Sequence, residues 1–245
     1  MDVGHIVRAA LIGAVSFVFL LVPAAPAAAQ EEDAEVGRGF FQVGSFVMDV
    51  DELNADLRGA GYPSLNDTFL SLGGAGFGER GRFLIGGEGH ALLGGDETSV
   101  DGTYRISAGG GYGLFRVGYV VLSSEGFDVF PMIGIGGGGM GLKIAERSVP
   151  TFDDVLDNPA RSSSLSTGMF LIDTSIGANY RAGLGGEAEG GFLVGVQVGY
   201  TFAPGDPKWE LDEINTVAGG PPFKIEGPYI RLSLGGWGSE EPEEG

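Results

Sequence analysis

Hydrophobic and polar residues alternate with a period of two over long stretches of this sequence. Between Phe192 and Phe202 every even position is apolar or aromatic, whereas the odd positions hold mainly glycine and polar residues. The stretch from Phe170 to Arg181 repeats the pattern, with aspartate, serine, asparagine and arginine on the odd positions. Such alternation is typical of a β-strand that has one apolar and one polar face.

The same pattern predicts eight extended segments, at 38–48, 67–77, 82–94, 103–123, 127–145, 165–181, 188–203 and 224–237. The connections between them alternate in length. Long connections cover 49–66, 95–102, 146–164 and 204–223, and tight glycine-containing turns cover 78–81, 124–126 and 182–187. A barrel whose long loops share one rim and whose short turns share the other produces this alternation. The predicted fold class is therefore all-β, an eight-stranded antiparallel up-and-down transmembrane β-barrel.

In two segments the apolar residues change between even and odd positions at a run of glycines. In 103–123 the apolar residues are even up to Ala108 and odd from Phe115 onward, with Gly109 to Gly111 between them. Segment 127–145 changes from odd to even across 136–139. One β-bulge in each strand would cause such a change. A turn hidden in the first glycine run would instead give nine strands.

The first long connection is expected to contain a short helix. Asp49 or Asp51 can serve as the N-cap, Leu53 and Leu57 share one face, and Gly59 lies at its end. A helix that covers the barrel mouth as a lid is favoured over a helix that binds a partner.

The alternation alone does not decide which face meets water. In a soluble barrel the apolar side chains would fill the interior, and the protein would be a secreted or periplasmic binder of an apolar small ligand. In a membrane barrel the apolar side chains face lipid and the polar ones face inward. The asymmetry of the turns and the scarcity of charges on the polar faces favour the membrane barrel.

The N-terminus has the features of a secretory signal peptide. Arg8 supplies the positive region, an apolar core covers 9–22, and small residues stand at Ala27 and Ala29, which predicts cleavage before Gln30. The predicted domains are a signal peptide at 1–29, the barrel at 30–237 and an acidic disordered tail at 238–245. Export followed by insertion predicts location in the outer membrane, with outer-membrane lipid as the main partner.

The composition excludes several functions. The 245 residues contain no Cys, so the chain has no disulfide scaffold, thiolate metal site or cysteine nucleophile. A formal net charge of -19 argues against nucleic acid as a partner. The 47 Gly would also fit a low-complexity chain, but the regular alternation argues against one.

Residues suited to catalysis are few. His90 is the single histidine after the signal peptide, and Glu88 lies on the same strand face. A Ser-His-Glu arrangement needs a serine within hydrogen-bond reach of the histidine, and the sequence assigns none. The carboxylates around Asp51 and around Asp154 do not match a twelve-residue calcium loop. No catalytic residue, metal or cofactor is expected, although a lipid-modifying barrel enzyme that uses His90 stays open as an alternative.

The alternation also assigns residues to surfaces. The predicted interior polar network consists of Glu88, His90, Arg116, Asp173, Asn179, Arg181 and Arg231. The residues predicted to face the membrane are Phe170, Ile172, Ile176, Phe192, Val194, Val196, Val198, Ile230, Leu232 and Leu234. The aromatic residues predicted to lie at the membrane–water interface are Tyr180, Tyr200, Phe202, Tyr229 and Trp237. Eight strands enclose a space that side chains can fill, so an aqueous pore is not expected.

The chain resembles the small eight-stranded outer-membrane β-barrel proteins of Gram-negative-type bacteria. The likeness lies in the signal peptide, the glycine-rich alternating strands, their aromatic ends and the last strand, 227–237. It departs from them in ending with an acidic segment after Trp237 rather than with an aromatic residue. The resemblance implies a non-enzymatic outer-membrane protein with a role in envelope integrity, or in contacts with a surface partner through its acidic extracellular loops.

Overall fold

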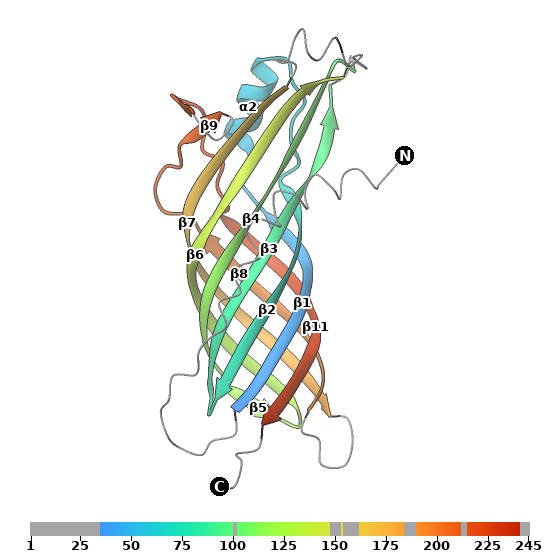
Figure 1. Cartoon of the computed structure of the whole chain (residues 1–245), viewed down its shortest axis with the longest axis vertical. Helices are drawn as coiled ribbons and strands as arrows, with labels where there is room; N and C mark the ends of the chain where they lie inside the picture. Colours follow the sequence, from blue (N-terminus) through green and yellow to red (C-terminus); the bar gives the residue numbers. More distant parts are fainter. Residues whose placement is uncertain are drawn as a thin grey trace.

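The computed structural model describes residues 35–99, 102–147, 153, 162–183, 190–211 and 215–240. Eight long strands in this part of the chain form a closed antiparallel ring, in which the last strand pairs with the first (Figure 1). In ring order they are β1 (Glu35–Val47), β2 (Thr68–Arg80), β3 (Phe83–Thr98), β4 (Tyr104–Tyr119), β6 (Phe127–Glu146), β7 (Ser162–Gly183), β8 (Gly190–Phe202) and β11 (Gly227–Glu240). Each strand pairs with the next along the chain, so the predicted eight-stranded up-and-down barrel is confirmed.

The long fourth segment forms one barrel strand and a short edge strand. β4 ends at Tyr119, and β5 (Leu122–Ser124) pairs with the start of β6. Glu125 and Gly126 then make the turn into β6 with φ values of 49° and 82°. The glycines at 109–111 contain no turn, because β4 stays paired with β6 through them.

Two boundaries differ from the sequence-based ones. The turn between β2 and β3 is made by Gly81 and Arg82, since Arg80 still pairs with Phe83. The predicted turn at 78–81 therefore begins too early. At the other end β11 includes residues 238–240, which were assigned to the tail and which pair with the start of β1. The predicted signal peptide and residues 241–245 lie outside the described residues.

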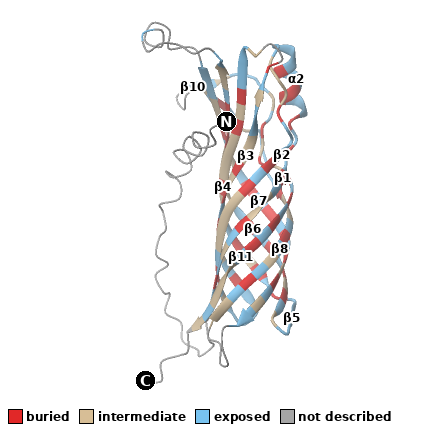
Figure 2. Ribbon diagram, turned by 90° about the vertical axis from the view of Figure 1, so that its right-hand side faces the viewer, coloured by how far each residue is buried: buried red, intermediate tan, exposed pale blue. Residues whose placement is uncertain are grey.

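On β7 and β8 the bulky apolar residues of the alternating segments point outward from the barrel. Val194 and Ile172 are 54% and 43% exposed, whereas Asp173 and Gln197 are 0% and 6% exposed. Figure 2 shows the resulting alternation of buried and exposed residues along the strands. A soluble barrel that holds an apolar ligand would need the opposite orientation, so that alternative is wrong. The sidedness is that of a transmembrane barrel.

The predicted bulges in 103–123 and 127–145 are absent from these two strands. β4 and β6 stay in unbroken register from Tyr104 paired with Glu146 to Gly118 paired with Met132. Even-numbered side chains point inward along the whole of β4, from Ile106 through to Arg116. The apolar parity changes although neither strand turns over, because bulky apolar residues point outward at one end of each strand and inward at the other. The register shift of this sheet lies in β3 instead, between Leu93 and Asp96.

A cap lies at the rim that carries the long connections. Its helix α2 (Asp51–Gly59) follows β1 and turns Leu53 and Leu57 toward an apolar core in the upper barrel, as a lid would. Val50, rather than Asp49 or Asp51, occupies the N-cap, and Asp49 Oδ1 accepts a hydrogen bond from the backbone N–H of Asp51 at 3.0 Å.

Two further strands that the sequence analysis did not predict belong to this cap. The first, β9 (Trp209–Leu211), pairs with β7, and the second, β10 (Asn215–Val217), pairs with β9. Within the described residues no helix could span a bilayer.

Large inward side chains lie against glycines of the neighbouring strands. A Cβ atom at Gly44 would be 2.9 Å from Cγ of Arg231, and one at Gly199 would be 2.5 Å from Cζ of Tyr229. The lumen of an eight-stranded barrel is only as wide as the side chains that fill it. Inward glycines therefore make room for arginine and aromatic side chains in this interior.

Candidate functional site: the charged interior of the barrel

Two arginines and two carboxylates meet in the middle of the barrel. Glu88 on β3 lies between Arg116 on β4 and Arg231 on β11, with its two carboxylate oxygens 2.7 Å from Arg116 Nη1 and 3.0 Å from Arg231 Nη1. Asp173 on β7 pairs with the other terminal nitrogen of Arg116. None of these side chains is accessible to solvent. Two cations and two anions balance one another, as buried charges must.

Hydroxyl groups complete this central network. The Tyr229 hydroxyl donates to Asp173 Oδ1 at 2.9 Å, and Thr201 Oγ1 donates to Asp173 Oδ2 at 2.8 Å. The guanidinium of Arg231 lies 3.7 Å from the ring centroid of Tyr229 and also contacts the Tyr112 hydroxyl. Stacking on an aromatic face stabilises a desolvated cation. The network therefore ties five strands together across the lumen.

His90 belongs to a hydrogen-bonded chain that joins this network through Gln197, whose amide nitrogen donates to Ser175 Oγ at 3.0 Å and to the Tyr229 hydroxyl at 3.4 Å. Its Nε2 lies 3.1 Å from Gln42 Oε1, and its Nδ1 lies 3.1 Å from Ser71 Oγ. The amide nitrogen of Gln42 donates to Gln197 Oε1 and Ser233 Oγ, both at 3.1 Å. The Gln42 carbonyl oxygen is thus the acceptor for Nε2–H, and Ser71 can donate to Nδ1.

A second ion cluster lies nearer the short turns. Arg38 Nε is 3.0 Å from Glu79 Oε2, and Arg38 Nη2 is 3.0 Å from Asp128 Oδ2. Arg181 Nε reaches the same oxygen of Asp128 at 3.0 Å. Arg38 and Asp128 are buried, and again two positive charges face two negative ones.

Apolar layers separate and cover the two ion clusters. One small cluster contains Phe77, Leu84, Val120, Phe130 and Met132, with Phe40 packed against it. A larger apolar core lies beyond the central network and continues to α2. Along β1 the inward residues pass in order from Arg38 through Phe40, Gln42 and Gly44 to Phe46, so charged, polar and apolar levels alternate along the axis. In the described part of the chain the interior is filled.

The residues predicted for the interior network all lie on inward faces. The structure brings Glu88, Arg116, Asp173 and Arg231 into direct contact through the central network. His90 lies close to them without sharing their ion pairs, whereas Asn179 pairs in register with Asp128, and Arg181 joins the second cluster. The ten residues predicted to face the membrane are all exposed on the outer wall.

Two of the five predicted interface aromatics lie elsewhere. Tyr229 is buried in the lumen, on the inward parity of β11 together with Arg231. Trp237 shares that inward parity, and Arg181 lies over its ring at 5.8 Å. Their place near a strand end suggested an interface position, but the parity of β11 decides their direction. Tyr180 and Phe202 are exposed, and Tyr200 packs beside Phe202 with ring centroids 4.5 Å apart.

Several residues of the interior were not singled out from the sequence. They are Arg38, Gln42, Glu79, Tyr112, Asp128 and Ser175. Asp128 stands on the parity opposite to Val129, Ile133 and Ile135, which is a signal that could have identified it. Tyr112 gives no such signal, because a tyrosine fits either face.

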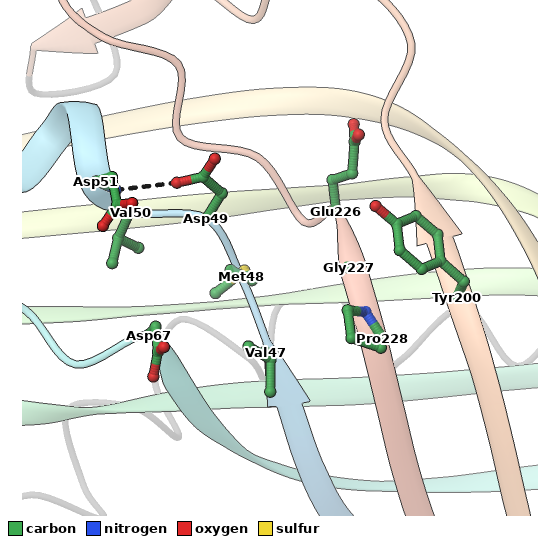
Figure 3. Close-up of a pocket in the computed structure, with 10 residues that line it drawn as sticks. All are labelled: Val47, Met48, Asp49, Val50, Asp51, Asp67, Tyr200, Glu226, Gly227 and Pro228. Carbon is green, nitrogen blue, oxygen red and sulfur yellow. Dashed lines mark hydrogen bonds between the residues drawn. The ribbon is translucent and has the colours of Figure 1, made fainter.

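Two clefts open at the rim with the long connections. One, of about 300 Å³, lies beside Tyr200 and carries the carboxylates of Asp49, Asp51, Asp67 and Glu226 (Figure 3). The other, of about 210 Å³, is mainly apolar and lies between α2 and the inner wall of β6 and β7. No group of three or more His, Cys, Asp or Glu residues among those described is arranged to hold a metal ion.

No protein-family model and no curated protein matches this sequence. The solved structures to which it is similar include three outer-membrane β-barrel proteins. The attachment invasion locus protein Ail of Yersinia pestis is 12% identical with a TM-score of 0.41, over 86% of this chain and 99% of that one. The outer membrane protein AlkL is 14% identical with a TM-score of 0.34, over 90% and 96%. The outer membrane protease OmpT of Escherichia coli is 10% identical with a TM-score of 0.39, over 87% and 99%. The barrel of this chain follows from its own strand pairing.

Proposed function

We propose that this protein is an outer-membrane β-barrel without enzymatic activity, which supports the envelope or contacts a partner through its acidic long loops. The observation that carries the proposal is the sidedness of the wall: apolar side chains are exposed outside and paired charges are buried inside. Water would disfavour that exterior and hydrocarbon would favour it. The partner that fits the outer wall is therefore lipid.

The filled interior supports a structural or surface role over transport. Two neutralised ion clusters and the apolar layers around them occupy the lumen along the described strands. A channel would need a continuous polar path through these layers. The long-loop rim offers instead exposed carboxylates at Asp49, Asp51, Glu52, Asp56 and Asp67, which suit a cationic surface partner.

The environment of His90 does not favour catalysis. Its contact with Ser71 resembles that of a general base with a hydroxyl nucleophile, but Ser71 is fully buried inside the barrel. The other ring nitrogen faces the amide of Gln42, where a hydrolytic triad has a carboxylate. We assign the side chains of Ser71, His90 and Gln42 to a structural hydrogen-bond network inside the barrel.

Membrane fractionation tests the location. The protein should stay with the membrane after carbonate or high-salt extraction, should need detergent for solubility, and should migrate differently on gels before and after heating. Release by carbonate without detergent would contradict the proposal.

Lipid analysis tests the absence of enzymatic activity. Cells that carry His90→Ala should have the same envelope lipid composition as cells that carry the unaltered protein, provided that both accumulate to the same level as heat-modifiable barrels. Ser71→Ala serves as the companion variant. A change in lipid composition in both variants would support the lipid-modifying alternative.

A further inference from the structure

The outward face of three strands changes from apolar to polar along its length. In the lower stretch, on the side of the short turns, the outward residues are bulky and exposed: Phe115 on β4, Ile133 and Ile135 on β6, and Phe170 and Ile172 on β7. The upper stretch lies on the side of α2. Above, on the same parity, stand Arg105, Ser107, Lys143, Ala145, Ser162, Ser164 and Ser166. No strand turns over between the two stretches, because the pairing of β4 with β6 and of β6 with β7 is continuous.

The inward face changes in the opposite sense. Beside the lower stretch it carries Arg116 and Asp173 of the central network. Beside the upper stretch it carries Ile106, Met140 and Leu142, all buried in the large apolar core. In the lower stretch the wall is therefore apolar on its outer face and charged on its inner face. In the upper stretch the outer face is polar and the inner face is apolar.

Outward glycines separate the two stretches. Gly109, Gly111 and Gly113 of β4 pair with Gly141, Gly139 and Gly137 of β6, and Gly139 also pairs with Gly168 of β7. We call these seven residues the glycine band. It presents neither a bulky apolar surface nor a charge, as suits the boundary between hydrocarbon and water.

We infer that the bilayer ends at the glycine band and that residues 96–98, 104–108, 142–146 and 162–167 stand in water as a half-shell with its own hydrophobic core. The inference rests on the proposed function, since it needs the lower wall to contact lipid. Figure 1 shows β3, β4, β6 and β7 continuing beyond the other barrel strands at the end that holds α2, and β3 stays paired with β4 as far as Thr98 and Arg105.

The lengths of the strands agree with this border. A tilted strand crosses a bilayer with roughly 9–11 residues. On β8 the outward apolar residues run from Phe192 to Phe202, and on β7 they run from Phe170 to Tyr180, which is close to one crossing. β7 begins at Ser162, so its first part has no hydrocarbon to face.

The half-shell is covered on its concave side by the cap. Leu53 and Leu57 of α2 and the buried Phe223 and Ile225 belong to the same apolar core as Ile106. In water the burial of these side chains stabilises the upper wall by the hydrophobic effect. Within the bilayer that driving force is absent, and strand pairing with the internal ion network takes its place.

Spin labels on single cysteines test the border. The chain has no Cys, so each variant carries one label. Ile135→Cys and Lys143→Cys compare two outward positions on β6, and Ile172→Cys and Ser164→Cys compare two on β7. In phosphatidylcholine vesicles, collisions of the label with oxygen should exceed those with a water-soluble nickel chelate at 135 and 172. The ratio should reverse at 143 and 164.

The pattern of results distinguishes failure of the border from failure of the membrane barrel. Lipid-like ratios at 143 and 164 together with lipid-like ratios at 135 and 172 would overturn the border but keep the membrane barrel. Water-like ratios at 135 and 172 would overturn both. Heat-modifiable mobility of every labelled variant shows that it has folded. For a variant that fails this check, Phe115→Cys and Ser107→Cys on β4 supply the same comparison.

Discussion

At the level of single residues, the interior depends on charges and glycines that would be unfavourable in most strands. The buried carboxylate of Glu88 is stabilised because two arginines pair with its oxygens. The aliphatic part of the Arg231 side chain fits because Gly44 beside it has no side chain. The inward direction of such charges follows from alternation in the sequence. Their mutual contacts do not, because they depend on which strands face each other across the lumen. Tyr229 shows the limit, since the sequence placed it at the interface and the structure places it beside Asp173.

Removal of the central carboxylate should destabilise the barrel strongly. Glu88→Gln leaves Arg116 and Arg231 with one anion between them, and breaking a buried pair costs about 3–5 kcal/mol. Urea unfolding in detergent micelles measures the change in free energy of unfolding. Asp96→Asn is the control, because its pair with Arg105 is exposed and such pairs contribute about 1 kcal/mol or less. Equal unfolding midpoints for the two variants would argue against the central network as a source of stability.

Inward and outward glycines of one strand should respond differently to alanine. At Gly44 the new methyl group would meet the backbone and side chain of Arg231, and overpacking of this kind costs about 1–3 kcal/mol. At Gly39 on the same strand no atom lies within 4 Å of the added Cβ. Gly44→Ala should therefore lower the unfolding midpoint, and Gly39→Ala should leave it nearly unchanged. The same shift in both variants would show that strand propensity, rather than lumen space, sets the effect.

At the level of elements, the sequence located all eight barrel strands to within a few residues, because period-two alternation persists in each. It misjudged the glycine runs of 103–123 and 127–145, where a change of parity was interpreted as a bulge. Alternation records which face is apolar, and that face depends on whether lipid or water surrounds the wall. It also missed β9 and β10, whose three-residue lengths carry no periodic signal.

A substitution in the buried face of the cap helix should destabilise that helix locally and leave the barrel folded. Leu57→Ala removes a buried side chain from the face of α2, and such a change costs about 2–5 kcal/mol of local packing. Hydrogen–deuterium exchange should therefore accelerate in 51–59 while the barrel strands stay protected. Glu52→Gln, on the exposed side of the same helix, should leave exchange there unchanged. Faster exchange throughout β1 to β11 would instead mean that the cap and barrel unfold together.

At the level of the whole molecule, the barrel is a filled body rather than a pore. Ion clusters and apolar layers succeed each other along the described part of the axis, so ions would have to cross both. Insertion into a planar lipid bilayer should therefore give no steady conductance above the background of the bare membrane. Stable single-channel steps that depend on the protein would contradict the filled interior.

The pairing of large side chains with glycines also restricts how neighbouring strands can align. A shift of β11 along β1 by two residues would keep every side chain on its correct face, so alternation by itself would tolerate it. It would, however, set Arg231 opposite Gln42 or Phe46 instead of Gly44. The misaligned ladder would be sterically blocked at that point and at each similar point around the ring. The glycines thereby select one stagger of the strands, and with it the diameter at which the cylinder closes.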